Sequence, residues 1–274
     1  MSRSNKIIKF MAEILAIVLI GLIIYGISSL IYGVSFIFGA NNKYDNSIML
    51  IQDSFINNID NFNFKIDSDK TNIKIVKSDS FNVKTNNKSI SIDYDKDSNS
   101  IIINEKRLPL FNFISSYDMT VYLPSTLFKE VNIFTNSGDV IIDSMVTNKL
   151  LLKVGSGKTD IDSLTVYKYA DIETGIGRVE IDGKMINNLE LSNGIGETIV
   201  NSNISGKSFI KSGVGNIKLN LSQAKKYYSF DIKKGIGDIV IDGDNKTEGS
   251  YGDGPISLFL ETNIGKIDIN FKEE

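Results

Sequence analysis

The chain of 274 residues contains no histidine, no cysteine and no tryptophan. Without histidine and cysteine it has no Ser–His–Asp or Cys–His nucleophile, no zinc-finger ligand set and no disulfide framework. It also lacks an excess of basic residues, because the net charge is −3, and this argues against a nucleic-acid partner. Apolar residues make up 42% and charged residues 23%, so most of the chain is expected to fold.

A long run without charge lies near the N-terminus. Residues 14–40 are 27 consecutive uncharged residues. As a helix they would extend about 40 Å, against roughly 30 Å for the hydrocarbon core of a bilayer. A buried core helix rarely stays apolar on every face for so long, and the apolar region of a cleaved signal peptide is shorter, roughly 7–15 residues. The run therefore predicts an uncleaved, tilted transmembrane helix, with the lipid bilayer as its partner.

Charge sets the expected orientation of this helix. Three basic residues and one acid precede it, so residues 1–13 are expected to stay in the cytoplasm. The whole chain carries −3 and this segment +2, which leaves −5 for residues 41–274, the part expected outside the cell. Residues 41–60 read either as a short helix or as an extended juxtamembrane stalk.

Glycine divides the exported part in two. Residues 41–137 contain none, whereas the last 137 residues contain 18. In the glycine-free part, short runs alternate apolar and polar residues between Asn, Asp, Ser and Lys clusters, which predicts strands and turns. The runs are 62–66, 72–76, 81–85, 89–94, 100–104 and 119–123. We expect an extracellular β domain over 61–274, with 61–130 as its first part and 131–274 as its repeated part.

The glycine-rich part is an internal repeat. Its marker glycines are spaced by 19, 20, 19, 19, 22 and 28 residues, and they are Gly138, Gly157, Gly177, Gly196, Gly215, Gly237 and Gly265. Five positions after each marker stands Asp or Asn, namely Asp143, Asp162, Asp182, Asn201, Asn220, Asp242 and Asn270. Positions two and four after, and five before, are aliphatic or Thr, and the position two before is Gly or Asn. The last interval carries a polar insertion, 244–254, expected to be a surface loop.

These columns predict a parallel β-solenoid of about 19–20-residue coils with two strands per turn. The corner glycines supply positive φ angles, and the next strand points its second and fourth residues inward. The Asp or Asn that ends this strand can bond backbone amides at the next corner. Identical columns in every copy favour parallel stacking of successive coils over antiparallel hairpins. The columns leave the handedness open.

Several segments carry a resemblance to a known family. They are the strand 119–124 (MTVYLP), which ends in Leu-Pro, the segments 131–133 and 137–140, and the Gly-Ile-Gly-Asp-Ile motif at 235–239 with its copies. On these residues the chain resembles, from Phe62 to the C-terminus, the putative-adhesin, beta-strand-repeat family of bacterial envelope proteins. The resemblance implies a β-solenoid and often an adjoining membrane helix. Some relatives take part in sensing or resisting cell-envelope stress, and the resemblance implies such a part as one expected function. It implies no catalytic motif.

The acidic residues suggest two kinds of chemistry, a calcium site and a glycosidase site. A calcium ladder needs a nine-residue period with paired glycines, and three of the seven Asp/Asn positions are neutral, so a structural turn ladder without metal or cofactor is favoured. A glycosidase needs clustered carboxylates that break the repeat, whereas the pairs 160/162 and 180/182 are ordinary outward positions. We therefore expect no enzymatic activity, although a polysaccharide-active enzyme stays as a third class.

The expected function is that of a membrane-anchored extracellular β-solenoid that acts by binding. One hypothesis is envelope-stress sensing or regulation, with a membrane or envelope protein as partner. The other is adhesin-like binding of surface glycan or of another cell. The short tether to the membrane favours the first.

Overall fold

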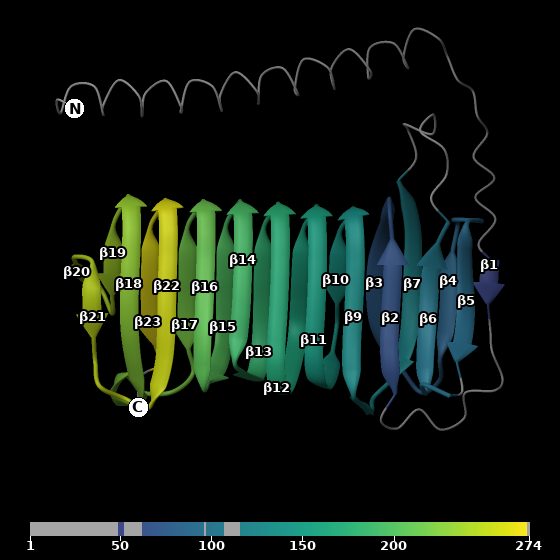
Figure 1. Ribbon diagram of the computed structural model, residues 1–274, viewed down its shortest axis with the longest axis horizontal. Helices are drawn as coiled ribbons and strands as arrows, with labels where there is room; N and C mark the ends of the chain where they lie inside the picture. Colours follow the sequence, from purple (N-terminus) through teal and green to yellow (C-terminus); the bar gives the residue numbers. More distant parts are fainter. Residues whose placement is uncertain (1–48, 52–61, 96, 107–115, 273–274) are drawn as a thin grey trace, which may run out of the picture. The chain divides into compact units, whose positions relative to one another are not determined.

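The computed structural model describes residues 49–51, 62–95, 97–106 and 116–272 (Figure 1). All of them belong to one compact unit, Ser47–Glu274. No helix within these ranges is long and apolar enough to cross a bilayer. The expected cytoplasmic segment 1–13 and transmembrane helix 14–40 lie outside the described residues, as does most of 41–60.

The described residues form a parallel β-solenoid, because strands of successive coils pair in parallel to build two long ladders. Ladder A is the front row of Figure 1. In spatial order it contains β6 (Ser100–Glu105), β2 (Asn63–Ser68), β9 (Glu130–Ser137), the second half of β11 (Met145–Ser156), the last third of β12 (Thr159–Ile176), β14 (Leu189–Ile195), β16 (Lys207–Val214), β22 (Ile256–Ile264) and β18 (Tyr228–Ile236).

Ladder B lies behind ladder A. In the same order it contains β7 (Tyr117–Pro124), β3 (Thr71–Ser78), β10 (Val140–Ile142), the start of β12, β13 (Val179–Asn187), β15 (Thr198–Ser205), β17 (Ile217–Leu221), β23 (Ile267–Phe271) and β19 (Ile239–Ile241). A third ladder runs beside it and joins β8 (Leu127–Phe128), the start of β11, the middle of β12 and the ends of β13 and β15. The middle coils thus have three paired segments per turn where two were expected.

The all-β prediction is confirmed, and the alternating runs of the glycine-free part are β2, β3, β4 (Asn82–Thr85), β5 (Ile90–Asp95), β6 and β7. The inward columns of the repeat form the core, with 0–1% of each side chain exposed. The column five before the marker, for example, contributes Ile133, Leu152, Ile172, Leu191, Ile210, Ile232 and Leu260. Burial of these aliphatic columns between the ladders is the main stabilising contribution.

The order of the coils in space differs from their order in the sequence at both ends, so the expectation of successive rungs holds only for the middle. After β17 the chain runs through a 3-10 turn (Lys225–Tyr227) and skips the adjacent rung. It forms β18 and β19 one rung further along the stack. It then returns, and β22 and β23 form the skipped rung between them and β16 and β17. Figure 1 shows the yellow β22 between the green β18 and β16. The long intervals of 22 and 28 residues correspond to this reversal.

The same reversal occurs at the other end, where β2 lies between β6 and β9. Antiparallel strands cover both ends of the stack: β4 and β1 (Met49–Ile51) beside β7, and β5 beside β6. At the far end, β20 (Asp244–Lys246) pairs with β19 and β21 (Gly249–Tyr251) with β18. The insertion 244–254, expected to be a loop, therefore forms two capping strands, which protect the open edges of the parallel ladders.

Candidate functional site

The marker glycines hold the corners between ladder A and ladder B. Their φ angles lie between +136° and +152°, a region that favours glycine. A Cβ at any of them would collide with the backbone of the neighbouring rung, as Gly196 would with the carbonyl of Gly177. The glycines two positions earlier, such as Gly194, lack a positive φ and are required by the same close approach alone. The two glycines of the repeat thus act for different reasons, where positive φ was expected at both.

The Asp/Asn column forms bonds other than those expected. Its side chains bond one another from rung to rung: Asn201 Nδ2 donates to Asp182, Asn220 Nδ2 donates to Asn201, and Asn270 Nδ2 donates to Asn220 over 3.2 Å. These amide donors occupy oxygens that a cation would need. Among the described residues, no three Asp, Glu, His or Cys side chains are grouped so that they could hold a metal ion.

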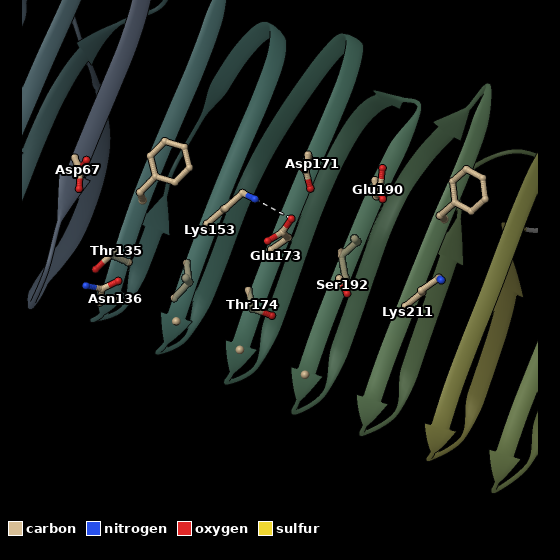
Figure 2. A pocket seen from close by; sticks show the side chains of 17 residues that line it. Asp67, Thr135, Asn136, Lys153, Asp171, Glu173, Thr174, Glu190, Ser192 and Lys211 are labelled. Atoms are coloured by element: carbon tan, nitrogen blue, oxygen red, sulfur yellow. Dashed lines mark hydrogen bonds and ion pairs between the residues drawn. The ribbon is translucent and has the colours of Figure 1, made fainter.

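The candidate binding site is a groove that the sequence columns do not reveal. It is an open depression of about 860 Å³ on the outer face of ladder A, across β9, β11, β12, β14 and β16. Figure 2 shows its polar side chains rising from neighbouring strands. The residues that line it include Asp67, Phe134, Asn136, Lys153, Gly155, Asp171, Glu173, Gly175, Glu190, Ser192, Gly194, Phe209 and Lys211.

An aromatic side chain stands at each end of the groove. Phe134 belongs to β9 and Phe209 to β16, four rungs apart, which corresponds to roughly 19 Å at the usual strand spacing. Phe209 stacks on Phe259 of β22 with ring centroids 4.8 Å apart, and Lys207 Nζ lies about 5 Å above both rings. Both phenylalanines are only half-buried, so each ring keeps an exposed part that a ligand can contact, although Phe259 already covers one face of Phe209.

Charged groups occupy the middle of the groove. Lys153 Nζ contacts Glu173 Oε1 at 2.8 Å, and this hydrogen bond raises the pKa of the lysine. Tyr169 OH donates to Glu190 Oε2 at 2.8 Å. Burial, followed by this contact with Glu190, raises the pKa of Tyr169 to about 12. Burial and the neighbouring Glu173 also raise the pKa of Asp171.

This arrangement suits reversible recognition of a polar ligand. Two of the three central carboxylates already have a cation or a phenol as partner. The acid pairs 160/162 and 180/182 lie elsewhere: Asp160 forms an ion pair with Lys158 on ladder B, and Glu180 forms one with Arg178. Neither pair lines the groove.

The sequence profile of a known family matches residues 58–269. The chain belongs to the Toastrack DUF4097 family. The match spans the solenoid of this Toastrack chain and confirms the family resemblance seen in its sequence motifs. No curated protein matches the chain.

Solved structures with a similar arrangement come from bacteria. A "putative cell adhesion protein" of Clostridium sporogenes ATCC 15579 is 14% identical, with 82% of this Toastrack chain and 99% of that chain covered and a TM-score of 0.35. A "putative adhesin" of Bacteroides fragilis NCTC 9343 is 13% identical, with 82% and 98% covered and a TM-score of 0.43. A "putative lipid binding protein" of Parabacteroides distasonis ATCC 8503 is 13% identical, with 84% and 98% covered and a TM-score of 0.33.

Proposed function

We propose that the protein is a binding protein of the bacterial cell envelope and that its groove binds a chain-like surface glycan. The observation that carries this proposal is the spacing of Phe134 and Phe209 at the two ends of an open, polar groove. Aromatic faces stack on the apolar faces of sugar rings. Between them, carboxylates accept hydrogen bonds from hydroxyl groups, and Lys153 and Lys211 donate to ring or acidic substituents. The proposed role is binding, without an enzymatic step.

Residues 14–40 are proposed to hold the protein in the cell membrane, with residues 1–13 in the cytoplasm and the solenoid outside. The uncharged length of this segment and the basic residues before it support this topology. Protease added to intact cells should digest the chain beyond residue 41 and leave the N-terminus. Complete protection of the solenoid would contradict the topology.

The glycan proposal is tested with the full chain in membranes and purified cell-wall glycan as ligand. Replacing Phe134 and Phe209 together with Ala should weaken binding at least about fivefold, because each stacked ring contributes about 0.5–1.5 kcal/mol beyond its buried area. The matched control is Tyr167→Ala, since this aromatic side chain is 46% exposed and does not line the groove. Equal binding by both variants would contradict the proposal, and hydrolysis of the glycan would revive the enzymatic alternative.

Envelope-stress sensing is the second candidate. The proposed anchor at 14–40 supports it, because the anchor keeps the solenoid close to membrane proteins and lipids. A stress reporter measured in cells with and without the protein tests this function. If replacing Phe134 and Phe209 with Ala changes the signal of the stress reporter without changing glycan binding, the ligand of the groove is a membrane partner.

A further inference from the structure

A row of exposed aliphatic side chains lies along one corner of the solenoid. Each is the residue directly before a marker glycine and the last residue of its strand in ladder A, at the arrowhead ends of β12, β14, β16, β22 and β18 in Figure 1. This aliphatic ridge consists of Ile176, Ile195, Val214, Ile264 and Ile236, which are 56%, 48%, 43%, 38% and 54% exposed. Strand pairing places them next to one another in this order.

The fold does not require aliphatic side chains at this corner. In the two preceding rungs the same position holds exposed Ser137 and Ser156, with the same pairing register. The ridge also crosses the point where the chain reverses, because Ile264 lies between Val214 and Ile236. Five aliphatic side chains thus adjoin in space although their order in the sequence differs. An exposed apolar row of this kind marks an interaction surface.

The residues on the two sides of the ridge indicate what covers it. On the ladder A side stand Gly175, Gly194, Gly213, Asn263 and Gly235, and the four glycines leave most of that flank without side chains. On the ladder B side, directly after each marker glycine, the row reads Arg178, Glu197, Asn216, Lys266 and Asp238 in spatial order. We call this row the charged flank. Its charges are plus, minus, neutral, plus and minus.

The charged flank is complementary to itself when it is reversed end to end. Consider a two-fold axis that passes by Asn216, lies in the plane between two facing copies and is perpendicular to the ridge. Rotation by 180° about this axis brings the two ridges together antiparallel and places each charged flank opposite the charged flank of the other copy. Arg178 then faces Asp238 of the other copy, and Glu197 faces Lys266. Asn216 faces itself on the axis. Every charge meets its opposite, which is the signature of an isologous two-fold interface.

The charges already have contacts within one chain, and these fit such an arrangement. Arg178 Nη2 contacts Glu180 at 2.9 Å and its Nε lies 3.8 Å from Glu197, while Lys266 Nζ contacts Asp268 at 2.9 Å. The side chains of Arg178, Glu197 and Lys266 are nevertheless 43–46% exposed, so each can accept a further partner. A lipid surface is a poorer match, because membrane-binding apolar faces are flanked by an excess of Lys and Arg and this flank has no net charge.

We propose that the aliphatic ridge is the interface of an antiparallel homodimer whose two-fold axis passes the rung of Val214 and Asn216. The ridge is about 19 Å long, four strand spacings, so the interface is smaller than those of permanent dimers and the dimer is reversible.

The absence of cysteine from the chain permits a direct test by cross-linking. In membranes that contain the full chain, Asn216→Cys should form a covalent dimer with a short bismaleimide. Arg178→Cys and Asp238→Cys should each give no dimer when expressed alone and should give one when co-expressed. The matched control is Lys218→Cys, exposed on the outer face of ladder B, which should label with a fluorescent maleimide but not dimerise. A dimer of Arg178→Cys with itself, or equal yields from Asn216→Cys and Lys218→Cys, would overturn the proposal.

A second set of variants tests whether the ridge is buried. Ile195→Ser and Ile264→Ser introduce the residue found at the same corner in other rungs, so the melting temperature should stay unchanged while the yield of the Asn216→Cys dimer falls at least about tenfold. Glu197→Lys should also lower the yield, and adding Lys266→Glu should restore it. If the serine variants keep the dimer yield and instead weaken binding to phosphatidylcholine–phosphatidylglycerol vesicles, the ridge contacts lipid and the homodimer is refuted.

Discussion

The carboxylate of Glu105 offers the sharpest test of how the glycine-free end of the solenoid is held. It lies at the end of β6 and accepts five hydrogen bonds of 2.6–3.3 Å, from Ser68 Oγ, Asp69 N, Lys70 N and Thr71 Oγ1 at Oε2 and from Asn87 Nδ2 at Oε1. One side chain thus accepts the hydrogen bonds from the turn between β2 and β3. The repeated rungs have a glycine corner at the equivalent place.

Replacement of Glu105 with Ala removes the acceptor of all five bonds. Thr71 and Asn87 are buried, with 0% and 1% exposed, so their donors lose a partner away from water. Each unsatisfied buried donor costs about 1–3 kcal/mol. Since water can still reach the two backbone amides, we expect a total loss of about 3–5 kcal/mol. Glu105→Gln keeps one oxygen for the β2–β3 turn but sets an amide group against Asn87 Nδ2, and should cost about 1–2 kcal/mol.

Urea denaturation followed by circular dichroism measures both losses. The control is Asp93→Ala, an exposed acid on the neighbouring β5, expected to change the free energy of unfolding by less than about 0.5 kcal/mol. If Glu105→Ala is as stable as this control, the hydrogen bonds do not hold the end of the stack and the reasoning is wrong.

The pH dependence supplies an independent check. Burial raises the pKa of Glu105, but the bonds from Ser68, Asp69, Thr71 and Asn87 outweigh burial, so its pKa is lowered from 4.5 in the folded state. The unfolded chain therefore binds the proton more tightly than the folded one. The contribution of Glu105 is complete above the unfolded pKa and is lost as the pH falls through the folded pKa. The difference in the free energy of unfolding between the wild type and Glu105→Gln should decrease below pH 4.5 and stay constant near neutrality.

Three further substitutions, the first with a matched control, test the repeat. Gly196→Ala should cost more than about 3 kcal/mol or prevent folding, because its Cβ meets the carbonyl of Gly177 at a φ of +142°; Gly243→Ala, with a positive φ but nothing within 4 Å, should cost only about 1 kcal/mol by the same urea assay. Ile181→Asp places a charge in a fully buried column and should cost several kcal/mol, so an unchanged melting temperature would contradict the assignment of that column. Asn220→Ala removes two hydrogen bonds of the Asp/Asn column and should lower the free energy of unfolding by about 1–2 kcal/mol. An unchanged free energy of unfolding would show that these hydrogen bonds do not stabilise the fold.

The sequence predicted the strands and the core because both depend on a local period. An inward residue such as Ile172 must be aliphatic in every rung, and a corner such as Gly177 must be glycine, so each recurs at a fixed interval. The order of the last rungs could not be predicted in this way. The columns would be the same if β22 were stacked on the outer side of β18 as they are with β22 inserted between β16 and β18. Only the longer intervals indicated the difference.

The groove was missed for a related reason. Outward positions such as Phe134, Lys153 and Glu173 are free to vary, so they form no column, and their proximity arises only when rungs stack. The signal available in the sequence was an aromatic residue at an outward position: the column of Phe134 is otherwise charged or Ser, whereas the column of Phe209 also contains Leu151 and Phe259.

The insertion of β22 and β23 between earlier rungs has a consequence for biosynthesis. Rungs up to β17 can assemble as the polypeptide leaves the ribosome, but β18 and β19 have no parallel neighbour until residues 256–271 have been translated. A nonsense mutation that deletes only these last strands would remove an interior layer and detach the capping end as well. Protein truncated before residue 256 should be cleared by proteases, so residues 256–271 are as indispensable to the product as any in its centre.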